Sequence, residues 1–297
     1  MAMNKYEKWF LACRPWSFTM TAISVSVGSA LAFLDGNFTW SLYLLTLAAM
    51  VVMHAATNLI NDYYDVLSGV DHPDVSTALY RPHPVLEGLL EPSQVRNVAW
   101  VLYGITAVVG IYLAASRGIM ILFIGLIGFV ASFTYTAPPL KYKYRAMGEF
   151  GVFLMWGPLM VEGAYFVQHQ MLSARAFWVS LPFGILVALV LLANNIRDIK
   201  HDSAKGIRTL PIAIGSRNGL RLYLSMIAIA YLSVITMVWW GSLKLWSLMV
   251  LLSLPLALKL LKQMATRIPL DADAQTAKID TIFGVLLVIS LILGGLS

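Results

Sequence analysis

Two groups of carboxylate and amide side chains, far apart in the sequence, each follow a long apolar run. The first group comprises Asn58, Asn61, Asp62, Asp65 and Asp71, and the second comprises Asn194, Asn195, Asp198 and Asp202. Only 15 acidic residues occur in the whole chain, so this concentration needs a physical reason. Carboxylate and amide oxygens are the hard ligands that Mg²⁺ prefers, and substrate phosphates and water usually complete its shell. The two groups therefore predict a magnesium site that holds a polyanion from opposite sides.

Within each group the spacing is that of one helix face. Polar residues recur from Asn58 to Asp65 at intervals of three and four, and Gly69 allows a bend that could return Asp71 toward the same face. At i, i+3 and i+7 the second group has Asn195, Asp198 and Asp202. A single Asp at a helix end is equally well explained by capping or solvation. Two groups with matching periodicity favour a metal site instead.

Other familiar metal and nucleotide sites do not fit the pattern. Gly69 follows Asp65 too soon for an EF-hand loop, and no terminal Glu occupies the required place. The five His residues are scattered and lack Cys partners for zinc, and no Gly-rich loop precedes a Lys as in a P-loop. Basic side chains on the same loops as the two groups can bind phosphate oxygens. They are Arg81, Lys141, Lys143, Arg145, Arg197, Lys200, Lys205 and Arg208.

A metal-bound diphosphate beside apolar helices suggests a lipid diphosphate as substrate. Ionisation of an allylic diphosphate separates a departing diphosphate from a carbocation, which the π face of an aromatic ring can stabilise. The candidate rings are Phe133, Tyr135, Trp156 and Tyr165. For each ring alone, packing or interfacial anchoring is the competing explanation.

The elements that must position these residues are membrane helices. The chain of 297 residues is 59% hydrophobic and 12% charged, with a mean hydropathy of +0.75, which predicts an all-α, polytopic membrane protein with a single domain over residues 1–297. Nine runs are long enough to cross about 30 Å of hydrocarbon. They cover residues 16–34, 41–57, 97–115, 118–136, 150–168, 177–196, 218–239, 245–262 and 279–296. A signal peptide at the first run is the alternative, but the later runs would keep the chain in the membrane.

Charge predicts the orientation of the chain. With the N-terminus inside, the outer segments hold only three basic residues, Arg117, Arg175 and Lys244, out of 21. The positive-inside rule then places the N-terminus and both polar groups in the cytoplasm, and we expect a bacterial or archaeal cell membrane. This sorting explains the net charge of +6 without nucleic-acid binding.

Several local sequence features predict turns, loops and kinks. A tight outer turn is predicted at 116–118, a shaped loop at 72–96, and a kink at Gly157-Pro158. The last three runs hold few ionisable residues and are expected to serve as scaffold. Asp271 and Asp273 alternate rather than share a helix face, so we expect them in a solvated loop.

The two groups together resemble the Asp-rich motifs of the UbiA superfamily of intramembrane aromatic prenyltransferases, and the likeness extends over nearly the whole chain. The motifs are Asn61-xxx-Asp65-xxxxx-Asp71 and Asn195-xx-Asp198-xxx-Asp202. Within the superfamily, three stretches are similar to the branch that prenylates 1,4-dihydroxy-2-naphthoate in menaquinone synthesis. These are Asn61-Asp62-Tyr-Tyr-Asp65-xxx-Gly69-x-Asp71, Tyr144-Arg145-Ala-Met-Gly148-Glu149 with Gly157-Pro158, and Asn194-Asn195-Ile-Arg197-Asp198 with Gly206-x-Arg208-Thr209-Leu210.

The resemblance implies nine helices around a central cavity open sideways to lipid, Mg²⁺ dependence, and transfer of a polyprenyl chain to a ring carbon with loss of CO₂. It implies Mg²⁺ ligands at Asn61, Asp62, Asp65, Asp71, Asn195, Asp198 and Asp202. It implies diphosphate contacts at Lys141, Arg145, Arg197 and Arg208. We expect a further diphosphate contact at Arg81, because this residue lies on an inner loop. Tyr135 is implied to lie near the reacting allylic carbon, so that Asp65, Asp198 and Tyr135 are the expected catalytic residues.

Two departures from the branch concern the loops. Ile207 follows Gly206 where the naphthoate branch often has Lys, and the Arg81-Pro82-His83-Pro84 loop differs from the Gly- and Ser-richer superfamily form. Other acceptors therefore stay open, namely 4-hydroxybenzoate or a prenol-accepting glycerol phosphate. A non-catalytic carrier is the alternative of a different class, although carriers commonly bind at the midplane rather than at one face. The expected partners are polyprenyl diphosphate, an aromatic acceptor and the lipid bilayer, with no nucleic acid.

Overall fold

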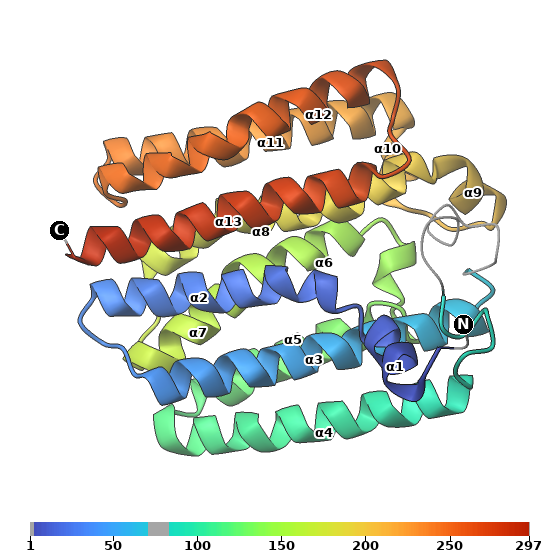
Figure 1. Ribbon diagram of the computed structural model, residues 1–297, viewed down its shortest axis with the longest axis horizontal. Coiled ribbons are helices and arrows are strands. Elements are labelled where there is room, and N and C mark those ends of the chain that lie inside the picture. The colour runs from blue at the N-terminus through green and yellow to red at the C-terminus, as the bar shows by residue number, and fades with distance from the viewer. Residues whose placement is uncertain (1–2, 71–82, 297) are drawn as a thin grey trace.

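The protein is an all-helical bundle in the computed structural model, which describes residues 3–70 and 83–296 (Figure 1). The helices are α1 (Lys5–Cys13), α2 (Phe18–Leu34), α3 (Trp40–Leu67), α4 (Pro92–Arg117), α5 (Met120–Thr134), α6 (Gly148–Leu154), α7 (Met160–His169), α8 (Ala174–Arg197), α9 (Ile199–Ala204), α10 (Leu210–Ile214), α11 (Ser216–Trp239), α12 (Leu254–Thr266) and α13 (Ala272–Leu296). No β-strand occurs in this part of the chain. The predicted fold class is confirmed.

The long helices are those of an integral membrane protein. Within the described ranges, eight helical segments are long and apolar enough to cross a bilayer, and α5 is a shorter apolar helix. The nine predicted spans coincide with these eight segments and α5. The nine-helix prediction is consistent with the structure.

The Gly157-Pro158 kink is present where the sequence predicts it. A π-helical turn over Met155–Leu159 joins α6 to α7, and Gly157 has the non-helical angles φ −83° and ψ −109°. Proline lacks the N–H that would continue the helix ladder, so the chain bends there. A Cβ added to Gly184 of α8 would lie 2.8 Å from the Gly157 Cα, so the two backbones are in direct contact. The kink therefore seats the α6–α7 segment against α8.

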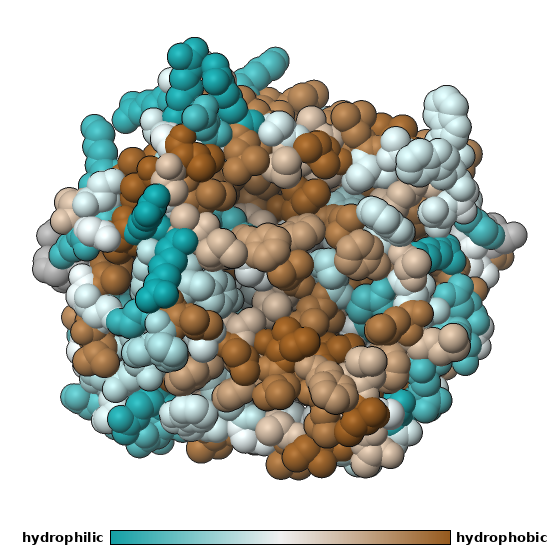
Figure 2. Space-filling view, turned by 180° about the vertical axis from the view of Figure 1, so that it is seen from behind, coloured by the Kyte–Doolittle hydropathy of each residue, from teal (hydrophilic) through white to brown (hydrophobic). Residues whose placement is uncertain are grey.

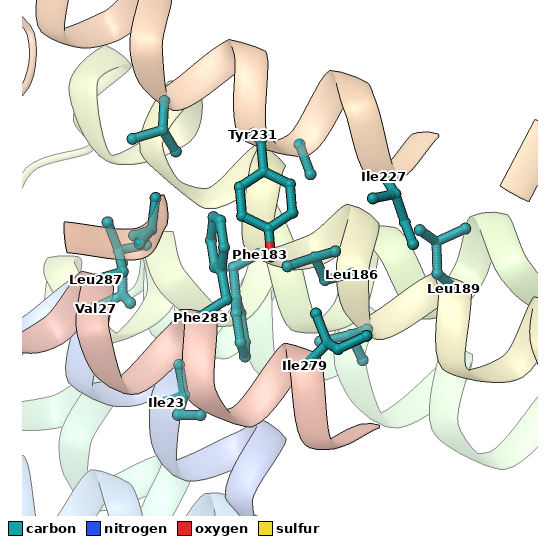
Figure 3. Packing of buried hydrophobic residues seen from close by; sticks show 14 of the residues in the cluster. Ile23, Val27, Phe183, Leu186, Leu189, Ile227, Tyr231, Ile279, Phe283 and Leu287 are labelled. Atoms are coloured by element: carbon teal, nitrogen blue, oxygen red, sulfur yellow. The ribbon is translucent and has the colours of Figure 1, made fainter. Parts of the chain in front are cut away.

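A large apolar core fixes α8, which carries the second polar group. Phe183 of α8 and Phe283 of α13 are fully buried and pack beside Tyr231 of α11, with Ile23 of α2 on the other side (Figure 3). Burial of each large side chain contributes about 1.5–3 kcal/mol. This core holds α2, α8, α11 and α13 as one unit.

A second apolar cluster fixes α3, which carries the first polar group. Leu59 and Ile60 of α3 are fully buried against Val95, Ala99 and Tyr103 of α4. Figure 1 shows the C-terminal end of α3 at the same end of the bundle as α9 and α10. We call this end, which holds both polar groups, the motif end.

Two elements differ from the sequence-based expectation. Helix α1 was not expected, because its nine residues are too short to register as a span; its Asn4 cap and Glu7 form a capping box. The solvated loop expected at Asp271 and Asp273 is wrong for Asp273, because α13 already begins at Ala272 and Asp273 is ion-paired in its first turn.

Candidate active site

A cavity of about 900 Å³ runs through the bundle from the motif end. One face of α3 lines it from Thr46 to Asp65, a stretch of about 28 Å at 1.5 Å per helical residue. The stripe on that face is Thr46, Ala49, Met50, Met53, His54, Thr57, Asn58, Asn61 and Asp65. The middle of this stripe, Ala49, Met50 and Met53, is apolar. Its amides and its carboxylate, Asn58, Asn61 and Asp65, lie at the motif end. The cavity therefore joins a polar head site to a long apolar passage.

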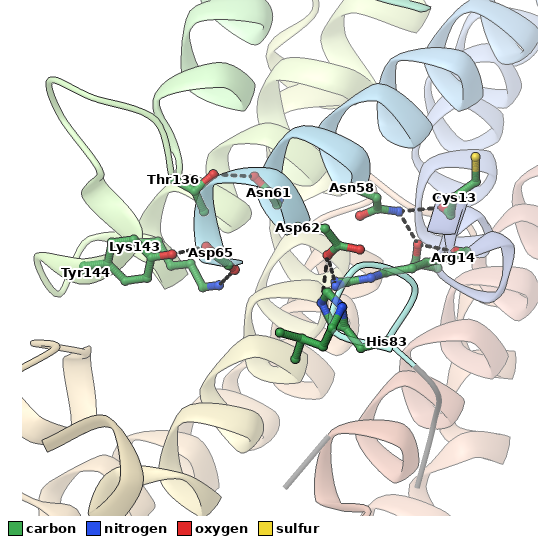
Figure 4. A network of polar contacts seen from close by, with 12 residues as sticks. Cys13, Arg14, Asn58, Asn61, Asp62, Asp65, His83, Thr136, Lys143 and Tyr144 are labelled. Carbon is green, nitrogen blue, oxygen red and sulfur yellow. Dashed lines mark hydrogen bonds and ion pairs between the residues drawn. The ribbon is translucent and has the colours of Figure 1, made fainter. Parts of the chain in front are cut away.

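Asp65 is the centre of the first polar group. Its carboxylate is buried, and Oδ2 accepts a hydrogen bond from the Lys143 ammonium at 2.6 Å while Oδ1 accepts from the Tyr144 hydroxyl (Figure 4). One helical turn earlier, Asn61 Oδ1 accepts from the Thr136 hydroxyl at 3.0 Å. Both Asn61 and Asp65 face the cavity. The loop after α5 thus holds the first group in place.

Asp62 does not line the cavity, but it contacts Arg14 and His83, which do. Its carboxylate is 1% exposed and accepts a hydrogen bond from the Arg14 guanidinium, with His83 Nε2 at 3.9 Å (Figure 4). In this arrangement Asp62 is an ion-pair partner of Arg14, and its predicted role as a metal ligand stays a prediction. Asp71, the other acidic residue predicted in this group, lies outside the described residues.

The second polar group lines the cavity from α8 and α9. Asn195, Asp198 and Asp202 all face it, and Asn195 Nδ2 donates to Glu149 Oε1 at 2.9 Å. This bond leaves the Asn195 amide oxygen for another partner. Burial and, to a lesser extent, the neighbouring Asp198 carboxylate raise the pKa of Asp202 to about 6. The neighbouring cations Lys143 and Arg197 lower the pKa of Asp202 and partly offset this repulsion, so positive charge stabilises the ionised pair.

Arg197 holds the second group rather than facing the cavity. Its side chain is 6% exposed, and all five N–H donors of its guanidinium have partners. Nε and Nη2 donate to Asp198 at 3.0 and 2.8 Å, Nη2 also to Asn194 at 2.6 Å, and Nη1 to Asp273 and the Leu270 carbonyl at 2.8 Å each. No donor is left for a phosphate oxygen in this arrangement. In this arrangement Arg197 orients Asp198, and the diphosphate contact at Arg197 stays a prediction.

The other predicted diphosphate cations lie around the cavity rather than on its wall. Arg145 and Arg208 are exposed, and a backbone bridge joins their segments, with Ala146 N donating to the Arg208 carbonyl at 2.7 Å. Lys141 is half-buried near Ser68. These three residues do not line the cavity. The predicted cation Arg81 lies outside the described residues.

The structure places on the cavity wall two cations that the predicted set of diphosphate contacts did not include. Arg14 and Lys143 both line the cavity at the motif end. Lys143 stood in the predicted list of basic loop residues, but nothing in its spacing distinguished it from Lys141. Arg14 precedes the first span and meets Asp62 only through the fold, 48 residues away in sequence. Tyr135, the predicted neighbour of the allylic carbon, lines the cavity with the Lys143 ammonium 5.8 Å from its ring centroid.

The residues present fit a Mg²⁺ site completed by substrate. Among the described residues, no three His, Cys, Asp or Glu side chains are close enough to hold a metal by themselves. Such a preformed cage is not required, because Mg²⁺ is usually held by one or two carboxylates plus substrate phosphates. Asp65 already binds a cation, the Lys143 ammonium, and the Asp198–Asp202 pair is relieved by positive charge. The side-chain atoms that would bind the metal are all oxygens, which Mg²⁺ prefers as ligands.

Comparison with known proteins gives consistent matches. Residues 21–291 match the UbiA prenyltransferase family. A 1,4-dihydroxy-2-naphthoate octaprenyltransferase of Bacillus subtilis is 31% identical over 94% of this chain and 90% of its own length. The UbiA prenyltransferase domain-containing protein 1 of Mus musculus is also 31% identical, over 98% of this chain and 85% of its own length.

Solved structures share the fold. A UbiA homologue from Aeropyrum pernix superposes with a TM-score of 0.71 at 17% identity, covering 91% of this chain and 97% of the other. A UbiA homologue from Archaeoglobus fulgidus, bound to GPP and Mg²⁺, gives a TM-score of 0.66 at 15% identity, covering 96% of this chain and 99% of the other. At these identities the likeness concerns the architecture.

Proposed function

Because this chain belongs to the UbiA prenyltransferase family, we propose that it transfers a polyprenyl group from polyprenyl diphosphate to 1,4-dihydroxy-2-naphthoate, with loss of CO₂, in menaquinone biosynthesis. The observation that carries the proposal is the cavity, which places two Asn/Asp groups at the end of a long apolar passage. A lipid diphosphate has the same division into a charged head and an apolar tail. Two observations support this acceptor: the 31% sequence identity to the Bacillus subtilis relative, and the residue pattern of the Asn61–Asp71 motif.

In this proposal the head site holds Mg²⁺ through oxygens of both groups. The ligands facing the cavity are Asn61, Asp65, Asn195, Asp198 and Asp202. Bound Mg²⁺ would act as a Lewis acid that neutralises the diphosphate as it departs. Asp71 stays a predicted ligand, as does Asp62, which is ion-paired with Arg14.

The protein's own cations and rings complete the chemistry. Lys143 and Arg14 supply positive charge at the head site, where it stabilises the developing negative charge of the diphosphate. Tyr135 and Trp156 also line the cavity, and their π faces are suited to a carbocation. The apolar walls exclude water, which would otherwise capture the cation.

The proposed orientation places the motif end in the cytoplasm. Its support is the distribution of Lys and Arg, which are concentrated on the segments at this end. A site at this end would receive a soluble acceptor from the cytoplasm and a lipid substrate from the bilayer. A bacterial cell membrane agrees with the Bacillus subtilis relative.

An acceptor panel tests the proposal. Purified protein in lipid nanodiscs is given octaprenyl diphosphate, Mg²⁺, and either 1,4-dihydroxy-2-naphthoate, 4-hydroxybenzoate or a glycerol phosphate, and the products are identified by mass spectrometry. We expect the decarboxylated, prenylated naphthalene ring as the main product. Preferential prenylation of either other acceptor would overturn the acceptor assignment but retain the transferase, whereas no product with any of the three would oppose the proposed function.

A further inference from the structure

One wall of the cavity, next to the head site, combines polar and aromatic side chains. It is formed by the 3₁₀ turn Pro15–Ser17, α2, α3 and the π-helical turn. We call this set of cavity-lining residues the polar niche: Ser17, Thr21, His54, Asn58 and Trp156. Asn58 precedes the predicted metal ligand Asp65 by seven residues, about 10 Å of helix at 1.5 Å per residue. The polar niche therefore lies just beyond the head site, where the apolar passage begins.

Hydrogen bonds within the niche assign the protons of its side chains. The Ser17 hydroxyl donates its single proton to the Arg14 carbonyl at 2.8 Å, so His54 Nε2 is the donor in its 3.2 Å contact with Ser17 Oγ. His54 Nδ1 then accepts from the Thr21 hydroxyl at 2.7 Å, and Thr21 Oγ1 accepts from Trp156 Nε1 at 3.1 Å. Both nitrogens of a neutral His54 ring are therefore occupied. We call this series of bonds the niche chain.

The niche chain ends at the Asn58 amide and fixes its direction. Asn58 Nδ2 donates to the Cys13 carbonyl at 2.9 Å and to Ser17 Oγ at 3.2 Å. A carbonyl oxygen can only accept, so the amide cannot be turned around. Figure 4 shows Oδ1 on the side of the Asn58 amide away from Cys13, and no described residue donates a hydrogen bond to this oxygen. Asn58 is 7% exposed and lines the cavity, so it offers the cavity a hydrogen-bond acceptor.

A hydrocarbon ligand would leave this oxygen unsatisfied. Hydrocarbon has no hydrogen-bond donor, and a buried polar group without a partner is costly. Most residues that line the cavity from α4 and α5 are apolar, among them Leu122 and Leu126. The space-filling view from behind the molecule likewise shows mainly hydrophobic side chains across the middle of that face (Figure 2). The apolar walls suit a prenyl tail, whereas the polar niche suits a ligand that carries a donor.

The aromatic members of the niche indicate which kind of donor fits. The His54 and Trp156 rings meet edge to face, with their centroids 5.1 Å apart, and both line the cavity. A further aromatic ring can pack against them in the same edge-to-face or in an offset geometry. A phenol combines such a ring with a hydroxyl that can donate to an amide oxygen.

We propose that the polar niche binds the aromatic acceptor through a hydrogen bond from a ring hydroxyl to Asn58 Oδ1, and that the niche chain holds this amide in place. The assignment rests on the proposed function, because it concerns the acceptor of that transfer. It places the acceptor ring beside the head site, where the allylic carbon is released. His54 has no nitrogen left for the hydroxyl proton, so it is a positioning residue and the hydroxyl binds as a neutral donor.

Acceptor binding tests the contact without turnover. Wild-type protein and Asn58→Leu, in nanodiscs with Mg²⁺ and the unreactive octaprenyl thiolodiphosphate, are titrated calorimetrically with 1,4-dihydroxy-2-naphthoate, 1-hydroxy-2-naphthoate and 4-hydroxy-2-naphthoate. One neutral hydrogen bond changes binding by up to about tenfold. We expect the wild type to bind the dihydroxy ring more tightly than at least one monohydroxy ring by about this factor, and Asn58→Leu to lose the preference. A preference that persists in Asn58→Leu, or that is absent from the wild type, would overturn the proposal.

The matched control is Thr57→Val, at the position next to Asn58. Thr57 also lines the cavity, but its hydroxyl donates to the Met53 carbonyl at 2.8 Å and contacts Ser132 Oγ at 2.6 Å. Valine has nearly the same shape as threonine, so this variant should keep the wild-type preference for the dihydroxy ring. A loss as large as that in Asn58→Leu would show that any change in the cavity wall abolishes the preference, and it would contradict the assignment to one oxygen.

A variant of the niche chain tests the positioning role. Thr21→Val removes the hydroxyl that links Trp156 to His54. We expect a smaller loss of the same preference, with unchanged affinity for the monohydroxy ring that lacks the bonded hydroxyl. Equal losses of affinity for all three rings would indicate a general structural effect and would refute positioning by the niche chain.

Two further outcomes separate this proposal from other roles of Asn58. Asn58→Ser, which keeps a polar side chain near the Cys13 carbonyl, provides the same readout if Asn58→Leu lacks a wild-type unfolding temperature. A higher Mg²⁺ requirement for transfer, with unchanged acceptor preference, would assign Asn58 to the metal site and overturn the proposal. Wild-type protein that prenylates no ring would instead overturn the proposed function, and the acceptor assignment with it.

Discussion

The Asp273 carboxylate, in the first turn of α13, accepts a hydrogen bond from Nη1 of Arg197 at the end of α8, at 2.8 Å. The same guanidinium makes two hydrogen bonds to Asp198. Asp273 is thereby connected through one side chain to a predicted metal ligand. The start of the last helix, expected to be scaffold, helps to orient the second polar group.

Removal of this connection should weaken metal binding. Loss of partners that orient metal ligands typically costs about 10–100-fold in metal affinity or activity. We therefore expect Asp273→Ala to raise the Mg²⁺ concentration for half-maximal transfer by about tenfold, measured by magnesium titration at saturating substrates. The control is Asp271→Ala, an exposed residue two positions earlier, which should leave the titration unchanged. Indistinguishable titrations for the two variants would refute the orienting role.

Two buried aspartates should respond oppositely to the loss of charge. Asp62 is 1% exposed and bound to Arg14, and breaking a buried ion pair on one side costs about 3 kcal/mol. Asp280 is fully buried, and within the described part of the chain neither of its oxygens has a hydrogen-bond partner. A buried carboxyl without a partner is itself destabilising. Asp62→Asn should thus lower the unfolding temperature in detergent, and Asp280→Asn should leave it equal or higher; a lower temperature for Asp280→Asn would be contrary to this account.

Glycine replacements should separate close packing from open space. A Cβ on Gly28 of α2 would lie 2.2 Å from the Val161 carbonyl oxygen, so Gly28→Ala forces α2 and α7 apart, at a cost of about 1–3 kcal/mol. A Cβ on Gly110 of α4 would meet nothing within 4 Å, so Gly110→Ala should stabilise the helix by about 0.5–1 kcal/mol. Thermal unfolding of both variants in one detergent checks the opposite signs. A loss of stability in both would show that the space at Gly110 is filled in the folded protein.

Much of the architecture could be predicted because it follows from local pattern. Apolar runs indicated all nine spans, Gly157-Pro158 indicated the kink, and i, i+3 or i+4 spacing placed Asn61 with Asp65 and Asn195 with Asp198 on cavity-facing stripes. These features depend on residues within a few turns of one another. The periodicity of the sequence is therefore enough to predict these features.

Contacts between distant segments could not be predicted from the sequence. Arg197 has the position of a phosphate ligand, but Asp273, 76 residues later, occupies its guanidinium. Asp62 shares the polar end of α3 with Asp65, but Arg14, 48 residues earlier, occupies its carboxylate. Asp273 was assigned to a solvated loop because it alternates with Asp271 and because the predicted last span began at residue 279, whereas α13 begins at Ala272. No local pattern reports such partners, since they are brought together only by packing of α8, α13 and the N-terminal segment.

The central claim is a metal-dependent prenyl transfer in which the two polar groups act together. The most direct measurement combines octaprenyl diphosphate, Mg²⁺ and 1,4-dihydroxy-2-naphthoate labelled in its carboxyl carbon, and follows prenylated product and labelled CO₂ in parallel. We predict equal amounts of both in the wild type, and neither product after EDTA treatment or in Asp65→Ala or Asp198→Ala, each checked for a wild-type unfolding temperature. Transfer that persists in EDTA, or that survives both substitutions, would contradict the account.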